Sequence, residues 1–341
     1  MDGNLVTGGT GYIGTHLVRL LRERGERVRV LDLQVPDQPV DGVEYRQGSI
    51  VDRDEVVAAV HGCRRVFHLA ALSALWIPDK RAFEDVNVRG TGNVLEAARE
   101  QAVETVVHTS TESILIAANR GRSEQWVNEF TAPDPAQMAG PYCASKLRAE
   151  AEVQAARRRF GQRVVVCTPT VPVGPGDPWL TPPTQMLLGF LNRRYPAWMP
   201  STLNLVDVRD VALGHLQAAE QGEPDQRYLL GGHDVQMADL LNALHALTGV
   251  AMPRLKVPYP VALVSAQVSE WLADRFTGKP PAASVTGVRL NGVPVRFDNR
   301  RTCAALDWKP RPLEPSLQGA IADFVGRGLF APANSRSGES R

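Results

Sequence analysis

A tyrosine and a lysine stand four positions apart in the segment Pro141-Tyr142-Cys143-Ala144-Ser145-Lys146. On a helix, this spacing places both side chains on one face. A phenol with its ordinary pKa of about 10 is a poor base at neutral pH, but a neighbouring ammonium stabilises the phenolate and lowers that pKa. The pair therefore predicts acid/base chemistry by Tyr142, with Lys146 as its electrostatic partner. Because ordinary helices often carry such a pair, the prediction depends on the surrounding motifs.

Hydroxyl side chains end the apolar run Val106-Val107-His108, which continues as Thr109-Ser110-Thr111. If this run is a buried parallel strand, its carboxyl end lies at the edge where open α/β sheets bind ligands. A hydroxyl there can hold the substrate oxygen that Tyr142 protonates or deprotonates. We expect Thr111 to do so, with Ser110 as the alternative. The competing interpretation is that these hydroxyls only cap the next helix.

Three glycines, Gly8, Gly11 and Gly14, follow the strand-like Leu5-Val6-Thr7 and precede an amphipathic segment. In a dinucleotide-binding turn, the first glycine permits a tight bend, the second lets a pyrophosphate approach the backbone, and the third lets helix and strand pack closely. The N-terminus of the helix then offers free N–H groups and a positive dipole to the phosphates. The spacing and its strand–helix context predict a dinucleotide site.

An acid, Asp32, ends the next strand-like run Val28-Arg29-Val30-Leu31. A carboxylate at this place accepts hydrogen bonds from the adenosine ribose hydroxyls and repels a 2′-phosphate, so the sequence predicts NAD in preference to NADP. The alternative is that Asp32 is a turn residue. Arg27 and Arg29 lie within the strand, where we do not expect them to bind a phosphate.

The elements that position these residues follow from hydrophobic periodicity. Short apolar runs alternate with longer amphipathic ones in the first two thirds of the chain, which is typical of a Rossmann-type, doubly wound parallel sheet with helices on both faces. Crossovers should be right-handed. The predicted strands are 5–7, 27–31, 43–46, 65–69, 105–109 and 163–167, and the predicted helices are 13–24, 54–60, 81–101 and 142–160.

Beyond residue 168 the alternation breaks, and prolines and glycines cluster in 168–183. We expect an NAD-binding core over 1–168, a mainly substrate-binding lobe over 169–330 with some segments returning to the core, and a disordered tail over 331–341. A strand is predicted at 228–230 and a helix at 237–248. In 261–276 apolar residues recur at helical spacing, which favours packing against the core over attachment to a membrane surface.

The composition argues against several other classes of protein. The 38 lysines and arginines nearly balance the 37 aspartates and glutamates, which gives no electrostatic footprint for nucleic acid or an anionic membrane. The four cysteines and seven histidines have no metal-ligand spacing, and so few cysteines suggest reduced thiols. There is no signal-peptide pattern, nor an apolar stretch of the roughly 18 to 20 residues that cross a bilayer. We therefore expect a cytoplasmic protein with a small-molecule partner, no metal, and no nucleic-acid or membrane partner.

As a set, these motifs resemble the extended short-chain dehydrogenase/reductase family, the NAD-dependent epimerase/dehydratase family. The resemblance extends from residue 4 to 325. Within the family, segments 72–79, 142–149, 168–175 and 204–215 are similar to hopanoid-associated sugar epimerases and dihydroflavonol-4-reductase-like proteins. The family landmarks are segments 7–14, 68–71, 87–91, 110–111, 174–176 and 207–212, together with Tyr142 and Lys146.

The resemblance implies a role for each matching residue. Thr111, Tyr142 and Lys146 would form the catalytic set, and the helices over 81–101 and 142–160 would form a homodimer interface. The cofactor contacts it implies run from the pyrophosphate through the adenosine to the nicotinamide: Gly8, Gly11, Tyr12, Ile13, Gly14, Asp32, Ser49, Ile50, Leu69, Ala70, Ala71, Asn87, Ser110, Tyr142, Lys146, Pro169 and Val171.

Departures from the family pattern bear on the substrate. Sugar-nucleotide members carry an arginine and an asparagine where this chain has Thr168 and Val171, and dehydratases follow the catalytic threonine with two acids where it has Glu112 and Ser113. The expected substrate wall is mostly apolar, which suits an alicyclic or lipid-like molecule. Some of its members can equally be core residues. The wall consists of Leu72, Trp76, Val171, Pro172, Trp179, Met186, Trp198 and Met199, and Thr111 is expected to contact the substrate as well.

The sequence therefore predicts an NAD-dependent enzyme that interconverts a secondary alcohol and a ketone on an apolar substrate. One alternative is an epimerase of sugars or nucleotide sugars, in which the hydride returns to the opposite face of a transient ketone. Another is a non-catalytic protein that senses NAD.

Overall fold

A seven-stranded parallel sheet forms the centre of the computed structural model, which describes residues 3–118 and 124–332. Its strand order is β11-β7-β5-β4-β1-β2-β3. Chain order reverses between β1 and β4, and this switch point is where open α/β sheets bind ligands. The strands are β1 Gly3–Thr7, β2 Arg27–Asp32, β3 Val43–Gln47, β4 Cys63–His68, β5 Thr105–Thr109, β7 Val164–Pro169 and β11 Arg227–Leu230.

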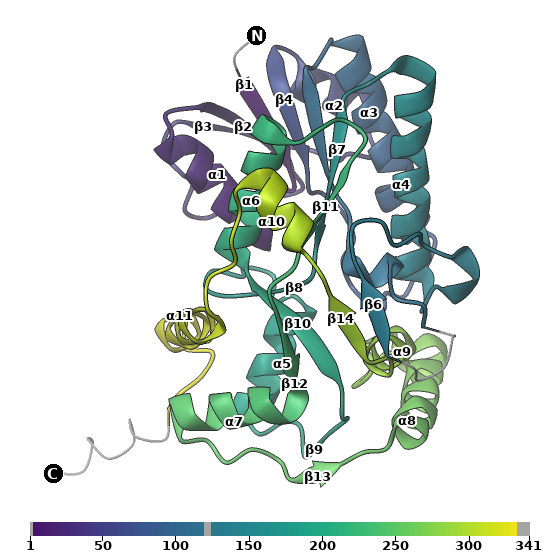
Figure 1. The fold of residues 1–341 in the computed structure, drawn as a ribbon, viewed down its shortest axis with the longest axis vertical. Coiled ribbons are helices and arrows are strands. Elements are labelled where there is room, and N and C mark those ends of the chain that lie inside the picture. Colours follow the sequence, from purple (N-terminus) through teal and green to yellow (C-terminus); the bar gives the residue numbers. More distant parts are fainter. Residues whose placement is uncertain (1–2, 119–123, 333–341) are drawn as a thin grey trace, which may run out of the picture.

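Helices cover both faces of this sheet (Figure 1). Helices α2 (Arg53–Val60), α3 (Gly90–Glu100) and α4 (Pro141–Phe160) lie on one face, and α1 (Tyr12–Glu23) and α6 (Val208–Gln221) lie on the other. Neighbouring residues of β1 divide between the two layers: Leu5 packs with the first group of helices, and Val6 with the second. This alternation is the period of two that a strand imposes. The expected Rossmann-type fold is confirmed.

Most predicted elements of the first part differ from the observed ones by one or two residues at their ends. The predicted helix 81–101 differs more, because a π-helical segment, η1 (Glu84–Arg89), precedes α3. From the later part of the chain, β11 pairs with β7, and α6 packs beside α1. Helix α10 (Arg300–Leu306) contributes Leu306 to the same core cluster.

The smaller lobe is built on a three-stranded sheet, β12-β10-β8. Its strands are β8 (Val171–Val173), β10 (Thr202–Asp207) and β12 (His233–Gln236), and helices α5 (Pro182–Leu191), α7 (Met237–Thr248) and α11 (Leu313–Gly326) share a core with them. The remaining elements are short: β6 Gln125–Val127 paired with β14 Val295–Phe297, β9 Ala197–Trp198 paired with β13 Leu255–Lys256, and the 3₁₀ turns η2 Glu112–Ile114 and η3 Pro135–Gln137.

The apolar stripe of 261–276 is helical, as predicted, but it does not face the core. It forms α8 (Tyr259–Leu272) and the π-helical η4 (Ala273–Thr277), which lie beside α9 (Val285–Asn291) (Figure 1). The small residues Ala266 and Ala273 are the buried ones, so the large residues face outward and the predicted core packing was wrong. The exposed fractions are 58% for Val261, 59% for Val264, 53% for Val268, 59% for Trp271, 43% for Leu272 and 70% for Phe276.

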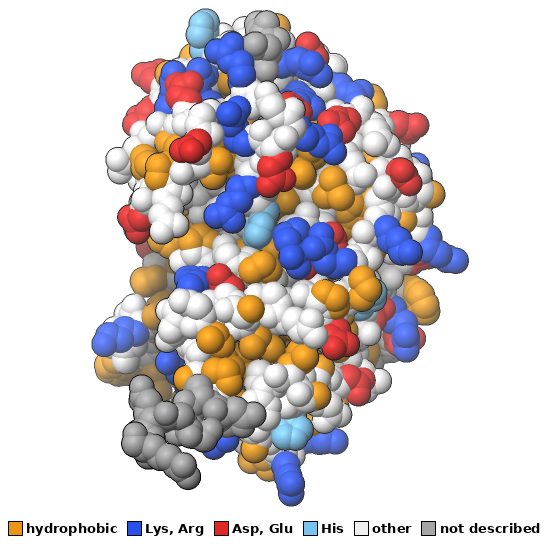
Figure 2. All heavy atoms as spheres, turned by 90° about the vertical axis from the view of Figure 1, so that its left-hand side faces the viewer, with side chains coloured by type: hydrophobic (Ala, Val, Ile, Leu, Met, Phe, Trp, Pro, Cys, Tyr) orange, Lys and Arg blue, Asp and Glu red, His pale blue; other side chains and the backbone are white. Residues whose placement is uncertain are grey.

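The distribution of surface charge and the character of the helices also bear on function. Acidic and basic side chains are interspersed on the face that carries α1 and α11, without a field of one sign (Figure 2). Among the residues that the structure describes, no helix combines the length and apolar character needed to cross a membrane. Of the tail predicted to be disordered, positions 333–341 lie outside the described residues.

Candidate active site

The glycine turn between β1 and α1 has the geometry that its spacing predicted. Gly8 adopts a left-handed φ of 73°, and a Cβ atom there would lie 2.6 Å from the backbone nitrogen of Ala70. A Cβ atom on Gly14 would overlap the Gly8 carbonyl oxygen. Gly11 directly precedes α1, and its N–H donates to that oxygen at 3.0 Å. The turn is therefore compact, and the N-terminus of α1 is aimed at the carboxyl edge of the sheet.

Asp32 is tied to this turn. One carboxylate oxygen accepts from the backbone N–H of Thr10 at 3.0 Å, and the other accepts from that of Leu33 at 2.8 Å. The following strand ends nearby, since Gly48 N donates to the Asp32 carbonyl at 2.8 Å. Ser49 and Ile50 come directly after it, with Ser49 N bound to Glu55 and Ile50 buried against Gly90. Asp32, Ser49 and Ile50, the residues expected around the adenosine, therefore lie together beside the glycine turn.

Three buried hydroxyls toward the same edge have no hydrogen-bond partner within the described part of the chain. They are Thr10 Oγ1 in the glycine turn, Ser110 Oγ just after β5 and Thr168 Oγ1 near the end of β7. Between them, Leu69 N donates to Thr7 O at 3.0 Å and Ala70 N donates to Thr7 Oγ1 at 3.3 Å, which holds the end of β4 beside β1. Unpaired buried hydroxyls next to a glycine turn fit the phosphates and hydroxyls of a dinucleotide, because buried polar atoms need partners.

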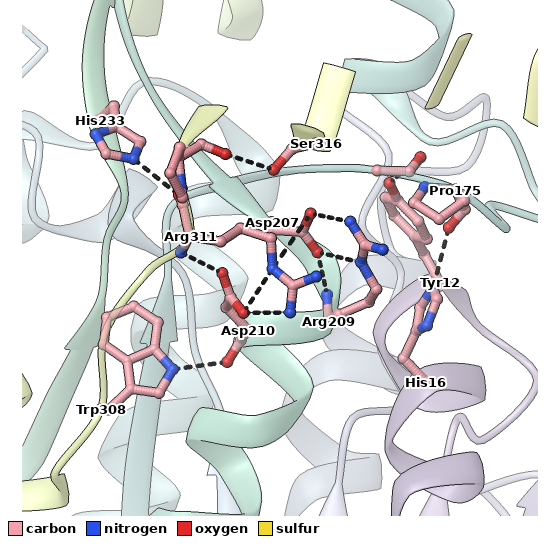
Figure 3. A network of polar contacts seen from close by, with 12 residues as sticks. Tyr12, His16, Pro175, Asp207, Arg209, Asp210, His233, Trp308, Arg311 and Ser316 are labelled. Atoms are coloured by element: carbon pink, nitrogen blue, oxygen red, sulfur yellow. Dashed lines mark hydrogen bonds and ion pairs between the residues drawn. The ribbon is translucent and has the colours of Figure 1, made fainter. Parts of the chain in front are cut away.

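Tyr12 and Ile13 use their side chains for architecture. The Tyr12 hydroxyl is buried and donates to the Gly174 carbonyl at 2.8 Å, and burial raises its pKa. His16, which the sequence did not single out, contacts the Pro175 carbonyl through Nε2 at 2.9 Å (Figure 3). Ile13 packs against the core cluster. Any cofactor contact of residues 12 and 13 is therefore left to their backbone.

The segment 207–212 takes part in an ionic network of buried acids and partly exposed arginines next to this turn (Figure 3). Asp207 caps α6 through Arg209 N at 2.8 Å and binds the Arg209 guanidinium at 2.9 and 2.7 Å. Burial raises the pKa of Asp207, but the hydrogen bonds from Arg209 outweigh this effect and hold it low. Asp210 binds Arg311 at 2.7 Å. This segment therefore fastens the lobe to the sheet.

Thr111, Glu112 and Tyr142 meet at the carboxyl end of β5. Thr111 Oγ1 donates to the Glu112 carboxylate at 3.0 Å and accepts from Ser113 N at 3.2 Å. The nearby Thr111 hydroxyl lowers the pKa of Tyr142, whereas the Glu112 charge raises it, so all three groups are within interaction distance. Burial raises the pKa of Glu112 to about 7. The sequence placed Thr111 and Tyr142 here but gave Glu112 no role, although it adjoins Thr111.

The expected effect of Lys146 on Tyr142 is absent. Burial is the main influence on Tyr142 and raises the pKa of its phenol, followed by the Glu112 charge, so the predicted lowering was wrong for the protein alone. Lys146 is itself buried, which lowers its pKa to about 8, and Nζ donates to the Thr109 carbonyl at 2.7 Å. Sharing a helix face brings two groups to one region, but burial decides the favoured protonation state.

A single amide joins the expected substrate wall to α4. Asn87 Oδ1 accepts from Leu72 N at 2.8 Å, while its Nδ2 donates to Ser145 Oγ at 2.9 Å and to Leu72 O at 3.2 Å. Ser145 Oγ then donates to the Tyr142 carbonyl at 2.8 Å. The position expected to support the cofactor therefore also fixes Leu72 relative to the helix of Tyr142.

The other expected wall residues contact different elements. Trp76 is buried, its Nε1 donates to Asp274 of η4 at 2.8 Å, and Lys80 Nζ lies 4.3 Å from its ring centre. Trp179 is 53% exposed. Val171, Met186 and Trp198 pack against the lobe core, and Pro172 lies in β8. Pro169, which is expected beside the nicotinamide, ends β7. The structure therefore does not gather these residues into one described pocket.

A separate cavity of about 370 Å³ lies between η2, β6 and the segment before α4. Ile114, Trp126 and Gln137 are among its lining residues, and none of the expected site residues lines it. Among the residues that the structure describes, no group of histidines, cysteines and acids is arranged to hold a metal ion.

Comparison with known proteins finds related sequences along most of the chain. The model of the NAD dependent epimerase/dehydratase family matches residues 4–231. A Synechocystis protein named as a dihydroflavonol 4-reductase is 33% identical over 335 residues, or 96% of each chain. Sterol demethylase protein B of Methylococcus capsulatus is 32% identical over 330 residues, covering 96% of this chain and 99% of the relative.

A solved structure has the same fold over nearly the whole chain. The crystal structure of gox2253 has a TM-score of 0.81 and 33% sequence identity to this protein, covering 97% of this chain and all of the other. The family match covers both the glycine turn and the Tyr142–Lys146 helix. The chain therefore belongs to the NAD dependent epimerase/dehydratase family of extended short-chain dehydrogenases/reductases, and it is an NAD-dependent enzyme.

Proposed function

We propose that the protein reduces a ketone to a secondary alcohol, reversibly, with NAD(H) as the hydride carrier. The proximity of Tyr142 to Thr111 at the carboxyl end of β5, on the same sheet edge as the glycine turn, carries this proposal. A proton-transferring phenol and a hydroxyl that can hold the same substrate oxygen are the two groups that carbonyl reduction needs from a protein.

The protonation state of Tyr142 supports the direction. When bound, NADH supplies the hydride, and NAD accepts it in the reverse reaction. A phenol with a raised pKa is protonated at neutral pH, as required of a group that gives its proton to a forming alkoxide. In alcohol oxidation, Tyr142 must instead take a proton as phenolate, a form that its buried position disfavours in the protein alone.

The remaining site residues would bind and orient the cofactor. The backbone at Gly8, Gly11 and Gly14 would hold the pyrophosphate, Asp32 the adenosine ribose, and Lys146 the nicotinamide ribose. Because the Asp32 carboxylate repels a 2′-phosphate, the proposal includes a preference for NAD over NADP. Residues 1–168, with α6 and β11, would form the cofactor-binding part, and the smaller lobe the substrate-binding part.

The proposed substrate is an apolar alicyclic or lipid-like molecule. Where sugar-nucleotide members have an arginine and an asparagine, this chain has Thr168, which is buried, and Val171, which packs into the lobe core. Neither offers a cation or an amide to a diphosphate. The two relatives are named for a dihydroflavonol and a sterol, neither of which is a nucleotide sugar.

A substrate screen with NADH absorbance tests the proposal. We expect NADH loss in proportion to the alcohol formed from apolar ring ketones, and no reaction with nucleotide sugars. The family also supports an epimerase, which would invert a sugar carbon without net absorbance change and would contradict the proposal. Binding of NAD without turnover across the whole panel would favour an NAD-sensing protein.

The proposal also includes a cytoplasmic homodimer, with η1, α3 and α4 at the interface as the family resemblance implies. Light scattering during size-exclusion chromatography measures this assembly. A monomer at micromolar concentration would contradict it.

A further inference from the structure

An exposed apolar face runs along α8 and η4. We call it the α8 face, and its residues are Val261, Val264, Val268, Trp271, Leu272 and Phe276. The spacings of three, four and one along α8 place its five members there on a stripe about 100° wide. All of them are at least 43% exposed. The opposite side of the helix is anchored on the protein through Ala266 and Ala273, so this face is directed outward.

Acidic and basic side chains occupy different places around the α8 face. Its two acids are used on the protein side: Glu270 accepts from Val285 N at 2.8 Å, and Asp274 accepts from Trp76 Nε1 at 2.8 Å and from Lys80 Nζ at 3.1 Å. Arg275 and Lys279, at the end of η4, are exposed, and no carboxylate among the described residues lies within ion-pair distance of either. The outer surface is therefore apolar with cations at its end.

We propose that the α8 face docks on the surface of an anionic lipid bilayer. A helix with an apolar stripe, aromatic residues and flanking cations binds in the headgroup layer without crossing it. Trp271 and Phe276 form an edge-on pair with ring centres 5.5 Å apart, and aromatic side chains favour that layer. Because the inner side of α8 is packed against α9, only the outer side can enter the lipid.

The charge pattern also argues against a second copy of this chain as the occupant. A two-fold interface brings the same patch of both copies together, so a surface with only cations at its end would face itself without acids to pair with. An anionic lipid surface supplies those negative charges over the whole length of the face.

Docking would bring the bilayer close to the expected substrate wall. Asp274 of η4 holds Trp76 through the 2.8 Å hydrogen bond, and Trp76 belongs to the loop that also carries Leu72. A lipid-like ketone dissolved in the bilayer could then reach the site without crossing bulk water. This step rests on the proposed function, whereas docking itself does not.

Flotation of the full chain with vesicles tests the proposal, without cofactor or substrate. We expect binding to vesicles of equal parts phosphatidylcholine and phosphatidylglycerol, and much weaker binding to phosphatidylcholine alone. The double variant Val264→Asp/Val268→Asp should bind at least about tenfold more weakly. Arg275→Ser/Lys279→Ser should lose about fivefold per cation, on the anionic vesicles only. The matched control is Phe130→Asp, which changes a residue that is 67% exposed outside the α8 face.

All these substitutions are at exposed positions, and an unchanged unfolding midpoint checks the fold. Absence of vesicle binding by the wild-type chain, or wild-type binding by the double aspartate variant, would overturn the proposal. A dimer that dissociates in that variant, without vesicle binding in either protein, would assign the face to a second copy instead. If vesicles bind but the soluble screen finds no ketone reduction, docking stands and only the proposed function fails.

Discussion

The amide nitrogen of Asn87 lies 2.9 Å from the hydroxyl oxygen of Ser145 and joins the loop after β4 to the helix that carries Tyr142. The same amide holds Leu72 through both backbone groups, and the Ser145 hydroxyl donates to the Tyr142 carbonyl at 2.8 Å. The separation between the proposed substrate wall and the proposed proton donor is therefore set by one buried side chain.

Ser145→Ala should destabilise the protein. One of the two N–H groups of the buried Asn87 amide loses its acceptor, while the other still donates to Leu72 O at 3.2 Å, and an unsatisfied buried donor costs about 1–3 kcal/mol. Urea unfolding of the variant measures this loss in the free energy of unfolding. Ser265→Ala, at an exposed position on α8, is the matched control and should stay within about 0.5 kcal/mol of wild type. Equal stability of the two variants would show that the Asn87 contact carries no net energy.

Tyr142→Phe should fold and bind NADH but lose catalysis. The ring contact with Phe83, whose centre lies 6.2 Å away, needs no hydroxyl, so packing is retained. The turnover number should fall by about 10²–10⁴, the usual contribution of a proton-transferring group. Tyr195→Phe makes the same change in the lobe, where the ring packs on Phe190, and should leave turnover intact. Near-normal turnover in Tyr142→Phe would remove this residue from the mechanism.

The sequence predicted the sheet well because its signals are local. Buried parallel strands such as β5 and β7 read as continuous apolar runs, and the glycines at 8, 11 and 14 encode a turn that few other residues can make. The pairing of β11 with β7 is not local, since it joins strands separated by the whole of α5 and β10. Apolar content alone gives no register or partner for such a strand.

Hydrophobic periodicity predicted the helix of the α8 stripe but not the surroundings of its apolar face. The spacing of Val261, Val264 and Val268 identified a helix with an apolar face, but it holds no information about what covers that face. The buried residues of α8 and η4 are Ala266 and Ala273, whose small side chains stand out less in an apolar pattern than valine or tryptophan, and the prediction therefore chose the wrong side.

In the candidate site, too, local features could be predicted from the sequence, whereas features that depend on tertiary structure could not. Helical spacing placed Tyr142 and Lys146 in one region, which the structure bears out, whereas their pKa values depend on burial and on Glu112, which reaches Tyr142 through tertiary structure. The sequence did not predict that the Tyr12 hydroxyl is bound to Gly174, a residue far along the chain, which leaves the predicted cofactor contact of Tyr12 to its backbone. Proximity along a helix can be predicted from sequence, and the depth of burial cannot.

Asp32→Asn should weaken the preference for NAD over NADP. The substitution keeps the side-chain shape and one acceptor oxygen, enough for either Thr10 N or Leu33 N, but removes the negative charge that repels a 2′-phosphate. Two charges 4 Å apart near a protein surface interact by about 1 to 4 kcal/mol, so the ratio of kcat/KM for the two cofactors should fall by at least about fivefold. Asp37→Asn, on the exposed loop after β2, is the control and should leave the ratio unchanged. An unaltered ratio in Asp32→Asn would show that the carboxylate does not select the cofactor.

Glu112 should make the protein less stable as pH rises from about 5 to about 7. Its pKa is raised from 4.5 to about 7 in the folded state, so between these values the folded protein holds a proton that the unfolded chain has lost. Stability then falls with pH, by up to about 1.4 kcal/mol per pH unit, and levels off above the folded pKa. Glu112→Gln cannot lose this proton, so its free energy of unfolding relative to wild type should increase between pH 5 and pH 7. Urea unfolding at both pH values measures the difference, with Glu152→Gln on the exposed side of α4 as a control that should show none. A constant difference between wild type and Glu112→Gln would mean that the carboxyl titrates near its ordinary pKa, and Tyr142 would then face a full negative charge at neutral pH.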